Sequence, residues 1–204
     1  VRYFLGAANC KASRRRPLSI TFAVGGAGAQ REFGHDIAVS MREKLAAGEL
    51  VLNLVAGVRK EVNEYFEEVK RDVLPDSAAI NILYAPTKAE YFAKFAELIR
   101  VTDILWTKPS ELSFYAGLGI PIIMAPTIGS QEEFNQKWLL EIQAGIPQDD
   151  PRYAVQWLYD LLHNGRLAES AWDGFLKARK YGTYKMREII ETGAMARETS
   201  PLKR

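Results

Sequence analysis

Residues 18–26 read Leu-Ser-Ile-Thr-Phe-Ala-Val-Gly-Gly, and this stretch decides the fold. The apolar and β-branched run ends at two glycines, which predicts a buried strand over Leu18–Val24 that enters a tight turn. A helix is expected next, from about His35 to Ala47, because its apolar residues recur on one face. A buried strand, a glycine turn and an amphipathic helix together predict the first unit of a parallel α/β sheet.

The same alternation continues along the chain. Further strands are predicted over Leu50–Val55, Ile80–Tyr84, Ile104–Trp106 and Pro121–Met124, and helices over Lys60–Lys70, 87–99, Glu111–Leu118 and 130–145, two of them opened by capping boxes at Thr87 and Ser130. Right-handed crossovers between such strands give a parallel, Rossmann-like sheet with helices on both faces. We expect a flanking segment at 1–16, a Rossmann-like domain at 17–150, and a helical C-terminal tail at 151–204 that extends the same domain.

Composition excludes several classes of protein. The 204 residues are 48% hydrophobic and 25% charged, as in ordinary globular proteins, and the net charge of +2 gives no support for a nucleic-acid partner. The single cysteine, Cys10, excludes an internal disulfide, and no apolar run approaches the roughly 18 residues of a membrane span. We expect a cytoplasmic protein. His35 and His163 lie outside any metal-binding spacing, so neither a metal nor a cofactor is expected.

Ligands of parallel sheets bind at the carboxyl ends of the strands, so the loops there are the candidate site. The first loop carries Gly25, Gly26 and Gly28, followed by Gln30. Glycines allow a phosphate to approach the backbone closely, and a valine at Gly26 or Gly28 would fill the phosphate space while leaving the fold nearly intact. The alternative interpretation is a tight turn with no ligand.

Two later loops carry polar side chains next to helix starts. Lys108, Ser110 and Glu111 follow the fourth strand, where a hydroxyl and backbone amides suit a phosphate and a carboxylate suits ribose hydroxyls. Gln131 and Glu132 open the next helix and are able to bind sugar hydroxyls. In both cases the alternative is a purely structural helix cap.

Taken in order, Thr102–Glu111, Gly117–Pro121 and Ser130–Asn135 resemble the C-terminal domain of GT-B glycosyltransferases. The resemblance is to the peptidoglycan N-acetylglucosaminyltransferases and the diacylglycerol galactosyltransferases, and it covers about Ser19 to Gly145. It implies that the first glycine-rich loop lies against the donor's diphosphate. It also implies that Tyr91 and Phe92 frame the uracil.

The resemblance further implies that Gln131 and Glu132 meet the hydroxyls of the donor sugar. Two positions depart from the family. Its ribose-binding glutamate corresponds to Phe114 here, with Glu111 lying three positions earlier, and Glu132 replaces a glutamine. These departures leave the identity of the base and of the sugar open.

The resemblance therefore implies the donor-binding half of a glycosyltransferase, a hexosyltransferase that uses a nucleoside diphosphate sugar, UDP-linked, without a metal. The acceptor and the catalytic base belong to an N-terminal acceptor domain missing from this chain, which alone is expected to be inactive. Half of a UDP-sugar 2-epimerase and a non-catalytic nucleotide-binding module are the alternatives. The aromatic-rich tail is expected to serve the absent domain, to form a homodimer, or to be poorly ordered after about Gly182. Peripheral membrane association is expected of the full-length protein.

Overall fold

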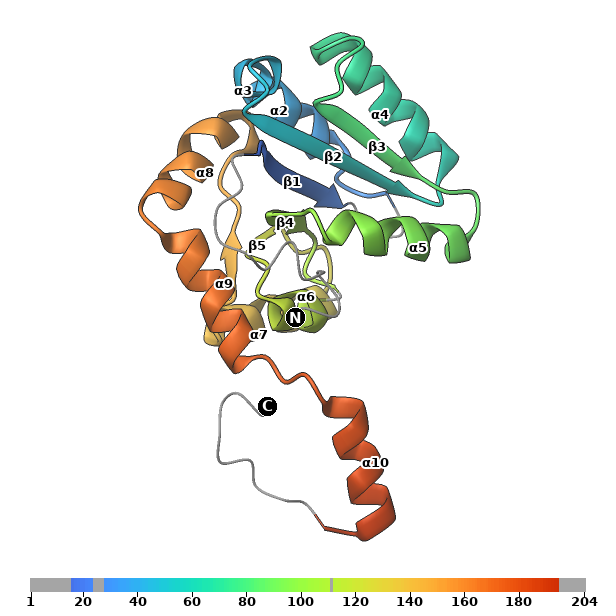
Figure 1. Ribbon diagram of the computed structural model, residues 1–204, viewed down its shortest axis with the longest axis vertical. Helices are drawn as coiled ribbons and strands as arrows, with labels where there is room; N and C mark the ends of the chain where they lie inside the picture. The colour runs from blue at the N-terminus through green and yellow to red at the C-terminus, as the bar shows by residue number, and fades with distance from the viewer. Residues whose placement is uncertain (1–15, 24–27, 111, 195–204) are drawn as a thin grey trace.

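The computed structural model describes residues 16–23, 28–110 and 112–194. Within them, six parallel strands form one sheet in the order β3-β2-β1-β4-β5-β6 (Figure 1). The strands are β1 (Leu18–Ala23), β2 (Leu50–Gly57), β3 (Ile80–Tyr84), β4 (Ile104–Thr107), β5 (Ile122–Met124) and β6 (Gly145–Pro147). The chain builds outward from β1 to β3 and then returns to place β4 on the other side of β1. This reversal creates a switch point between β1 and β4, where parallel sheets bind ligands.

Helices cover both faces of the sheet, as the sequence predicts. They are α2 (Glu32–Ser40), α3 (Arg42–Ala46), α4 (Lys60–Val73), α5 (Lys88–Ile99), α6 (Leu112–Leu118), α7 (Ser130–Glu141), α8 (Ala154–His163), α9 (Arg166–Lys177) and α10 (Gly182–Thr192), with a short 3-10 turn, η1 (Pro151–Tyr153). On one face Phe22, Leu54 and Trp106 are buried with residues of α2, α4 and α8. On the other, Val55 and Leu105 are buried with residues of α5 and α6.

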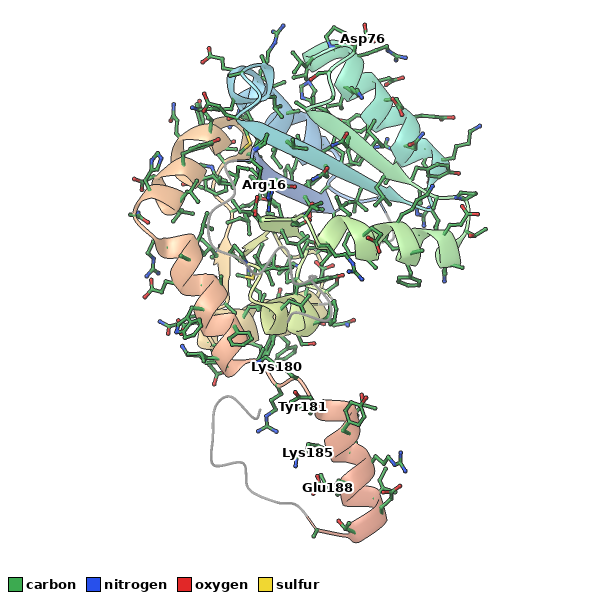
Figure 2. The ribbon with its side chains drawn as sticks, in the orientation of Figure 1. Arg16, Asp76, Lys180, Tyr181, Lys185 and Glu188 are labelled. Carbon is green, nitrogen blue, oxygen red and sulfur yellow. The ribbon has the colours of Figure 1, made fainter. Side chains whose placement is uncertain are left out.

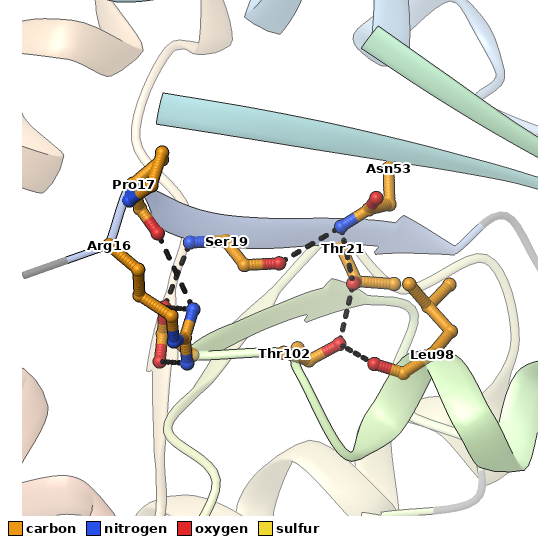
Figure 3. Close-up of polar contacts among 8 residues, drawn as sticks. Arg16, Pro17, Ser19, Thr21, Asn53, Leu98 and Thr102 are labelled. Atoms are coloured by element: carbon orange, nitrogen blue, oxygen red, sulfur yellow. Dashed lines mark hydrogen bonds and ion pairs between the residues drawn. The ribbon is translucent and has the colours of Figure 1, made fainter. Parts of the chain in front are cut away.

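A chain of buried polar side chains ties α5 to the sheet (Figure 3). The Asn53 side-chain amide donates to Ser19 Oγ at 3.0 Å and to Thr21 Oγ1 at 3.4 Å. Thr21 Oγ1 lies 2.7 Å from Thr102 Oγ1, which itself donates to the Leu98 carbonyl at 2.9 Å. Because the Thr102 proton is used on that carbonyl, the Thr21 hydroxyl is the donor between the two threonines. The buried polar groups are thus satisfied, and the last turn of α5 is registered against β1.

Three local predictions differ from the structure. The helix predicted over His35–Ala47 is two helices, α2 and α3, separated at Met41, where φ is −98° and ψ is 7°. The capping box predicted at Ser130 is wrong, because Gly129 is the N-cap of α7 and contributes no side chain. Strand β6 was not predicted, since a three-residue strand with Gly and Pro at its ends has little β propensity. The cap at Thr87 is confirmed, with Thr87 Oγ1 accepting from the Glu90 N–H at 3.3 Å.

The C-terminal tail begins against the sheet and ends away from it. Leu158 of α8 and Leu167 of α9 are buried in the main core. By contrast, α10 has no buried residue and projects from the body of the domain (Figure 1), and Figure 2 shows the side chains of Tyr181, Lys185 and Glu188 along it. The tail therefore presents an open surface.

The aromatic side chains of the tail share this exposure. Trp172 is 61% exposed and Tyr184 73% exposed, while Phe175 is partly buried. The structure leaves Trp172, Tyr181 and Tyr184 exposed and Phe175 partly buried. It therefore does not contradict the expectation that the tail serves another surface. No helix in the part of the chain that the structure describes is long and apolar enough to cross a bilayer.

Candidate functional site

A cavity of about 320 Å³ opens at the carboxyl edge of the sheet, beside the switch point. Strands β1, β2 and β4 contribute its floor, and α5 and α6 contribute one wall. Its lining consists of Ala23, Ala56, Gly57, Val58, Arg59, Lys88, Tyr91, Phe92, Phe95, Leu105, Thr107, Ser110 and Tyr115. The floor is held together locally, since Thr107 Oγ1 donates to the Ala23 carbonyl at 3.1 Å.

Aromatic rings form the wall of the cavity. The Tyr91 ring stacks on Phe95 with centroids 5.4 Å apart and planes inclined by 23°, and it lies 5.4 Å from the Phe92 ring. Phe95 in turn meets Tyr115 edge-on at 6.1 Å. Phe92 remains 62% exposed although it lines the cavity. The arrangement offers a planar ligand an apolar surface to stack on.

Two cationic side chains line the same cavity. Arg59 follows β2, and Lys88 is the first residue of α5. The Arg59 guanidinium pairs with Glu61 Oε1 at 3.1 Å. The backbone N–H of Glu61 and the Arg59 side chain together hold the pKa of the Glu61 carboxyl below its ordinary value. Among the described lining residues the charged groups are these two cations, so the cavity is suited to an anion such as a phosphate.

The first loop approaches this edge from the start of α2. Gly28 and Gln30 both have positive φ, +69° and 68°. The Gln30 side-chain amide donates to the Pro126 carbonyl at 3.0 Å, which joins the first loop to the loop between β5 and α7. A side chain at Gly28 would point at α4, because its Cβ would lie 2.7 Å from Val62 Cγ2. The prediction that a valine at Gly28 leaves the fold nearly intact is therefore wrong.

The loop after β4 is tied to the start of α7. Lys108 Nζ lies 2.8 Å from Glu132 Oε1, and the Ile128 N–H donates to Glu132 Oε2 at 2.8 Å. The Asn135 amide donates to the carbonyls of Pro109 and Ser110, each at 3.0 Å. These contacts place Ser110 at the cavity and Lys108 beside it.

The structure thus gathers part of the predicted site. Tyr91, Phe92 and Ser110 line one cavity, and Lys108 pairs with Glu132 next to it. Gln131 lies exposed in the first turn of α7, and Gln30 lies just ahead of α2. Gly25, Gly26 and Glu111 lie outside the described residues.

Of the thirteen lining residues, the predicted site included three, Tyr91, Phe92 and Ser110, and the positions it missed include Gly57, Val58, Arg59, Lys88 and Tyr115. Gly57 is the last residue of β2, which extends two residues beyond its predicted end at Val55, and Val58 and Arg59 follow the strand. The sequence contains a signal for Val58 and Arg59, because the loop after the second strand lies at the same carboxyl edge of the sheet as the three candidate loops. No cluster of three or more His, Cys, Asp or Glu side chains suited to a metal occurs within residues 16–23, 28–110 and 112–194. The absence of a metal from the reaction stays a prediction.

Comparisons with known proteins bear on the fold. A family model described as a domain of unknown function (DUF6938) matches residues 56–192. No curated protein sequence matches the chain. Among solved structures, Acinetobacter baumannii MurG is similar to this chain, with a TM-score of 0.67 and 19% sequence identity. The match covers 93% of this chain and 52% of the MurG chain.

Two other solved structures give the same picture. S. aureus MnaA, solved with UDP, has a TM-score of 0.61 and 12% identity and covers 86% of this chain and 46% of its own. The spinosyn rhamnosyltransferase SpnG has a TM-score of 0.53 and 14% identity, covering 91% of this chain and 47% of its own. The chain therefore spans about half the length of each of these proteins and shares the fold of that half. The predicted architecture is confirmed.

Proposed function

We propose that this chain binds a nucleoside diphosphate sugar. The chain belongs to the family described as a domain of unknown function (DUF6938), and it has the fold of the C-terminal domain of GT-B glycosyltransferases. The nucleotide we expect is UDP. In this proposal the chain is the donor-binding half of a glycosyltransferase, and a separate domain binds the acceptor.

The observation that carries the proposal is a cavity that joins an aromatic wall to cationic side chains at the carboxyl edge of the sheet. A nucleobase is planar and apolar on its faces, which suits stacking against Tyr91 and Phe92. A diphosphate is anionic, which suits Arg59, Lys88 and the backbone near Gly28. A nucleoside diphosphate presents both features at once.

The other predicted residues take roles around the diphosphate and the sugar. Ser110 lines the cavity and has a hydroxyl to offer to a phosphate oxygen. Gln131 and Glu132 lie in the first turn of α7, where we propose that they meet the donor sugar. Lys108 acts beside them through its ion pair with Glu132. Gln30, with Gly25 and Gly26, completes the phosphate loop, and Glu111 the ribose contact.

In the proposed reaction, the bond between the donor sugar and the diphosphate breaks as the acceptor oxygen attacks. Negative charge develops on the leaving diphosphate, where Arg59, Lys88 and the amides at helix starts would stabilise it. The group that takes the proton from the acceptor would come from the acceptor-binding domain. The GT-B resemblance of the sequence supports a reaction that needs no resident metal ion.

The exposed tail supports the proposal of a second domain. Helix α10 buries none of its residues, and Trp172, Tyr184 and Ile190 are 61%, 73% and 83% exposed. Exposed apolar groups gathered in one region favour association. We propose that this surface packs on the acceptor-binding domain, and a homodimer through the tail is the alternative. Membrane association would then belong to the assembled protein.

Isothermal titration of the chain with UDP, GDP, ADP and TDP tests the proposal. We expect UDP to bind at micromolar to millimolar strength, about 4–8 kcal/mol of binding free energy. UDP-sugars should bind at least as well, because the sugar adds contacts at α7. Failure of all four diphosphates to bind would show that the cavity is not a nucleotide site.

A further inference from the structure

The start of α7 is fastened to the loop between β4 and α6 by three side chains, Lys108, Glu132 and Asn135, which we name the clasp. Glu132 and Asn135 are three residues apart on α7 and so share a face of the helix. Both reach toward the same loop, Glu132 to the Lys108 side chain and Asn135 to the backbone. One helical turn therefore holds a loop that lines the cavity.

The ion pair of the clasp is protected from solvent. Lys108 is 8% exposed, and its Nζ lies 2.8 Å from Glu132 Oε1. The second carboxylate oxygen of Glu132 accepts from the Ile128 N–H at 2.8 Å. A lysine ammonium at this depth requires a partner, because an unpaired buried charge is strongly unfavourable. Glu132 therefore serves as the charge partner that keeps the Lys108 ammonium paired in this position.

The amide of Asn135 fixes the loop backbone itself. Its two hydrogens go to the carbonyls of Pro109 and Ser110, each at 3.0 Å, and the Ser110 N–H donates to the Lys108 carbonyl at 2.7 Å. Two successive carbonyls are thereby held from outside the loop. The position of Ser110 at the cavity is thus set by α7 rather than by the loop alone.

We propose that the clasp is a positioning device for ligand binding: it holds Ser110 and the adjoining backbone in the binding conformation before the nucleotide arrives. The proposal rests on the proposed nucleotide-binding function. A loop that is ordered in advance loses less conformational entropy on binding. Because the nucleobase would stack on α5, loosening the clasp should weaken the phosphate contacts and spare those to the base.

Two variants with matched controls test the clasp. Glu132→Gln removes the charge that pairs with Lys108, and Glu133→Gln removes the neighbouring exposed carboxylate as its control. Asn135→Asp keeps the size of the side chain but loses both donors, and Gln136→Glu adds the same charge one residue away. We measure the affinity of each protein for UDP and for uridine by NMR titration, and the hydrogen exchange of the backbone amides of Thr107, Lys108 and Ser110.

Each clasp variant loses one or two of the hydrogen bonds that order the loop before the ligand binds. We therefore expect UDP to bind about three- to tenfold more weakly to both clasp variants. Uridine affinity should stay within about twofold of the parent protein, since a twofold change is below half a kcal/mol. The loop amides should exchange hydrogen faster in the clasp variants than in the parent protein, and at the parent's rate in both controls.

Three results would overturn the inference. Clasp variants that bind UDP as the parent does would leave the nucleotide site intact and remove the positioning role. Equal losses for UDP and uridine would mark general destabilisation. A parent protein that binds none of the nucleoside diphosphates would remove the proposed function and the clasp's role together.

Discussion

Phe92 is the residue of the aromatic wall that depends least on the core of the domain. It lines the cavity and stays 62% exposed, whereas its neighbours Tyr91 and Phe95 stack on each other at 5.4 Å and contribute to the core. The energy that Phe92 adds to folding is therefore small. Its removal should report on ligand binding with little effect on stability.

Phe92→Ala is expected to weaken UDP binding by about five- to tenfold, the loss of roughly one aromatic contact. The free energy of unfolding should change by less than about 0.5 kcal/mol, as for other exposed positions. Titration calorimetry and urea denaturation measure the two effects. Phe134→Ala, at a ring that is 70% exposed on α7 and outside the cavity, is the control and should alter neither. Unchanged affinity in Phe92→Ala would remove this ring from the site.

A comparison of alanine variants at Gly28 and Gly48 distinguishes the cost of backbone strain from the cost of steric overlap. Both have φ of +69°, but a Cβ at Gly48 would meet no atom, while one at Gly28 would overlap Val62 Cγ2. Gly48→Ala should cost about 1–2 kcal/mol of unfolding free energy from its left-handed conformation alone. Gly28→Ala should cost about 1–3 kcal/mol more, the price of overpacking. Urea denaturation of both variants checks the difference, and equal losses would mean that Val62 can move aside.

At the scale of the elements, α6 and α9 pack closely against each other. The Gly174 position of α9 faces α6, where a Cβ would lie 2.9 Å from the Ala116 carbonyl oxygen and 3.1 Å from Ala144 Cβ. The first of these atoms is backbone and cannot rotate away. The absence of a side chain at Gly174 is what lets α9 pack against α6.

Gly174→Ala is therefore expected to lower the unfolding free energy by about 1–2 kcal/mol, because overpacking outweighs the gain in helix propensity of about 1 kcal/mol. Gly182→Ala, in the first turn of α10 with open space around it, is the matched control and should be neutral or slightly stabilising. Thermal and urea denaturation compare the two. A Gly174→Ala protein as stable as its parent would show that the two helices can separate without loss.

At the scale of the whole molecule, the structure divides into a packed body and a projecting helix. The body includes α8 and α9 through Leu158 and Leu167, which are buried in the core. Helix α10 buries nothing. The two parts should therefore respond differently to truncation.

Truncation after Tyr181, which removes α10 and all that follows, should leave the unfolding free energy of the body within about 0.5 kcal/mol of the parent. Truncation after Asn164, which also removes α9 with the buried Leu167, should prevent stable folding. Circular dichroism during denaturation measures both, and light scattering shows whether self-association depends on α10. If the truncation after Tyr181 markedly lowers the unfolding free energy, α10 packs on the body.

The sequence by itself determined those features that depend on near neighbours. Apolar periodicity located the buried strands β1 to β5 and the covering helices, because a strand or helix repeats its burial pattern within a few residues. The order of these elements implied a parallel sheet and its carboxyl edge. The resemblance to GT-B glycosyltransferases, rather than the apolar periodicity, singled out Tyr91 and Phe92, which lie in the first turns of α5.

Only the tertiary structure decided which of the distant side chains meet. Lys108 and Glu132 were both candidate ligand contacts, and the fold pairs them because the end of β4 and the start of α7 lie close together at the sheet edge. Likewise, only the fold places Val62 of α4 where a Cβ at Gly28 would point. Such contacts join loops that are far apart in the sequence and that the crossovers bring together. A local sequence pattern does not predict them, because side-chain partners depend on the three-dimensional packing of whole elements.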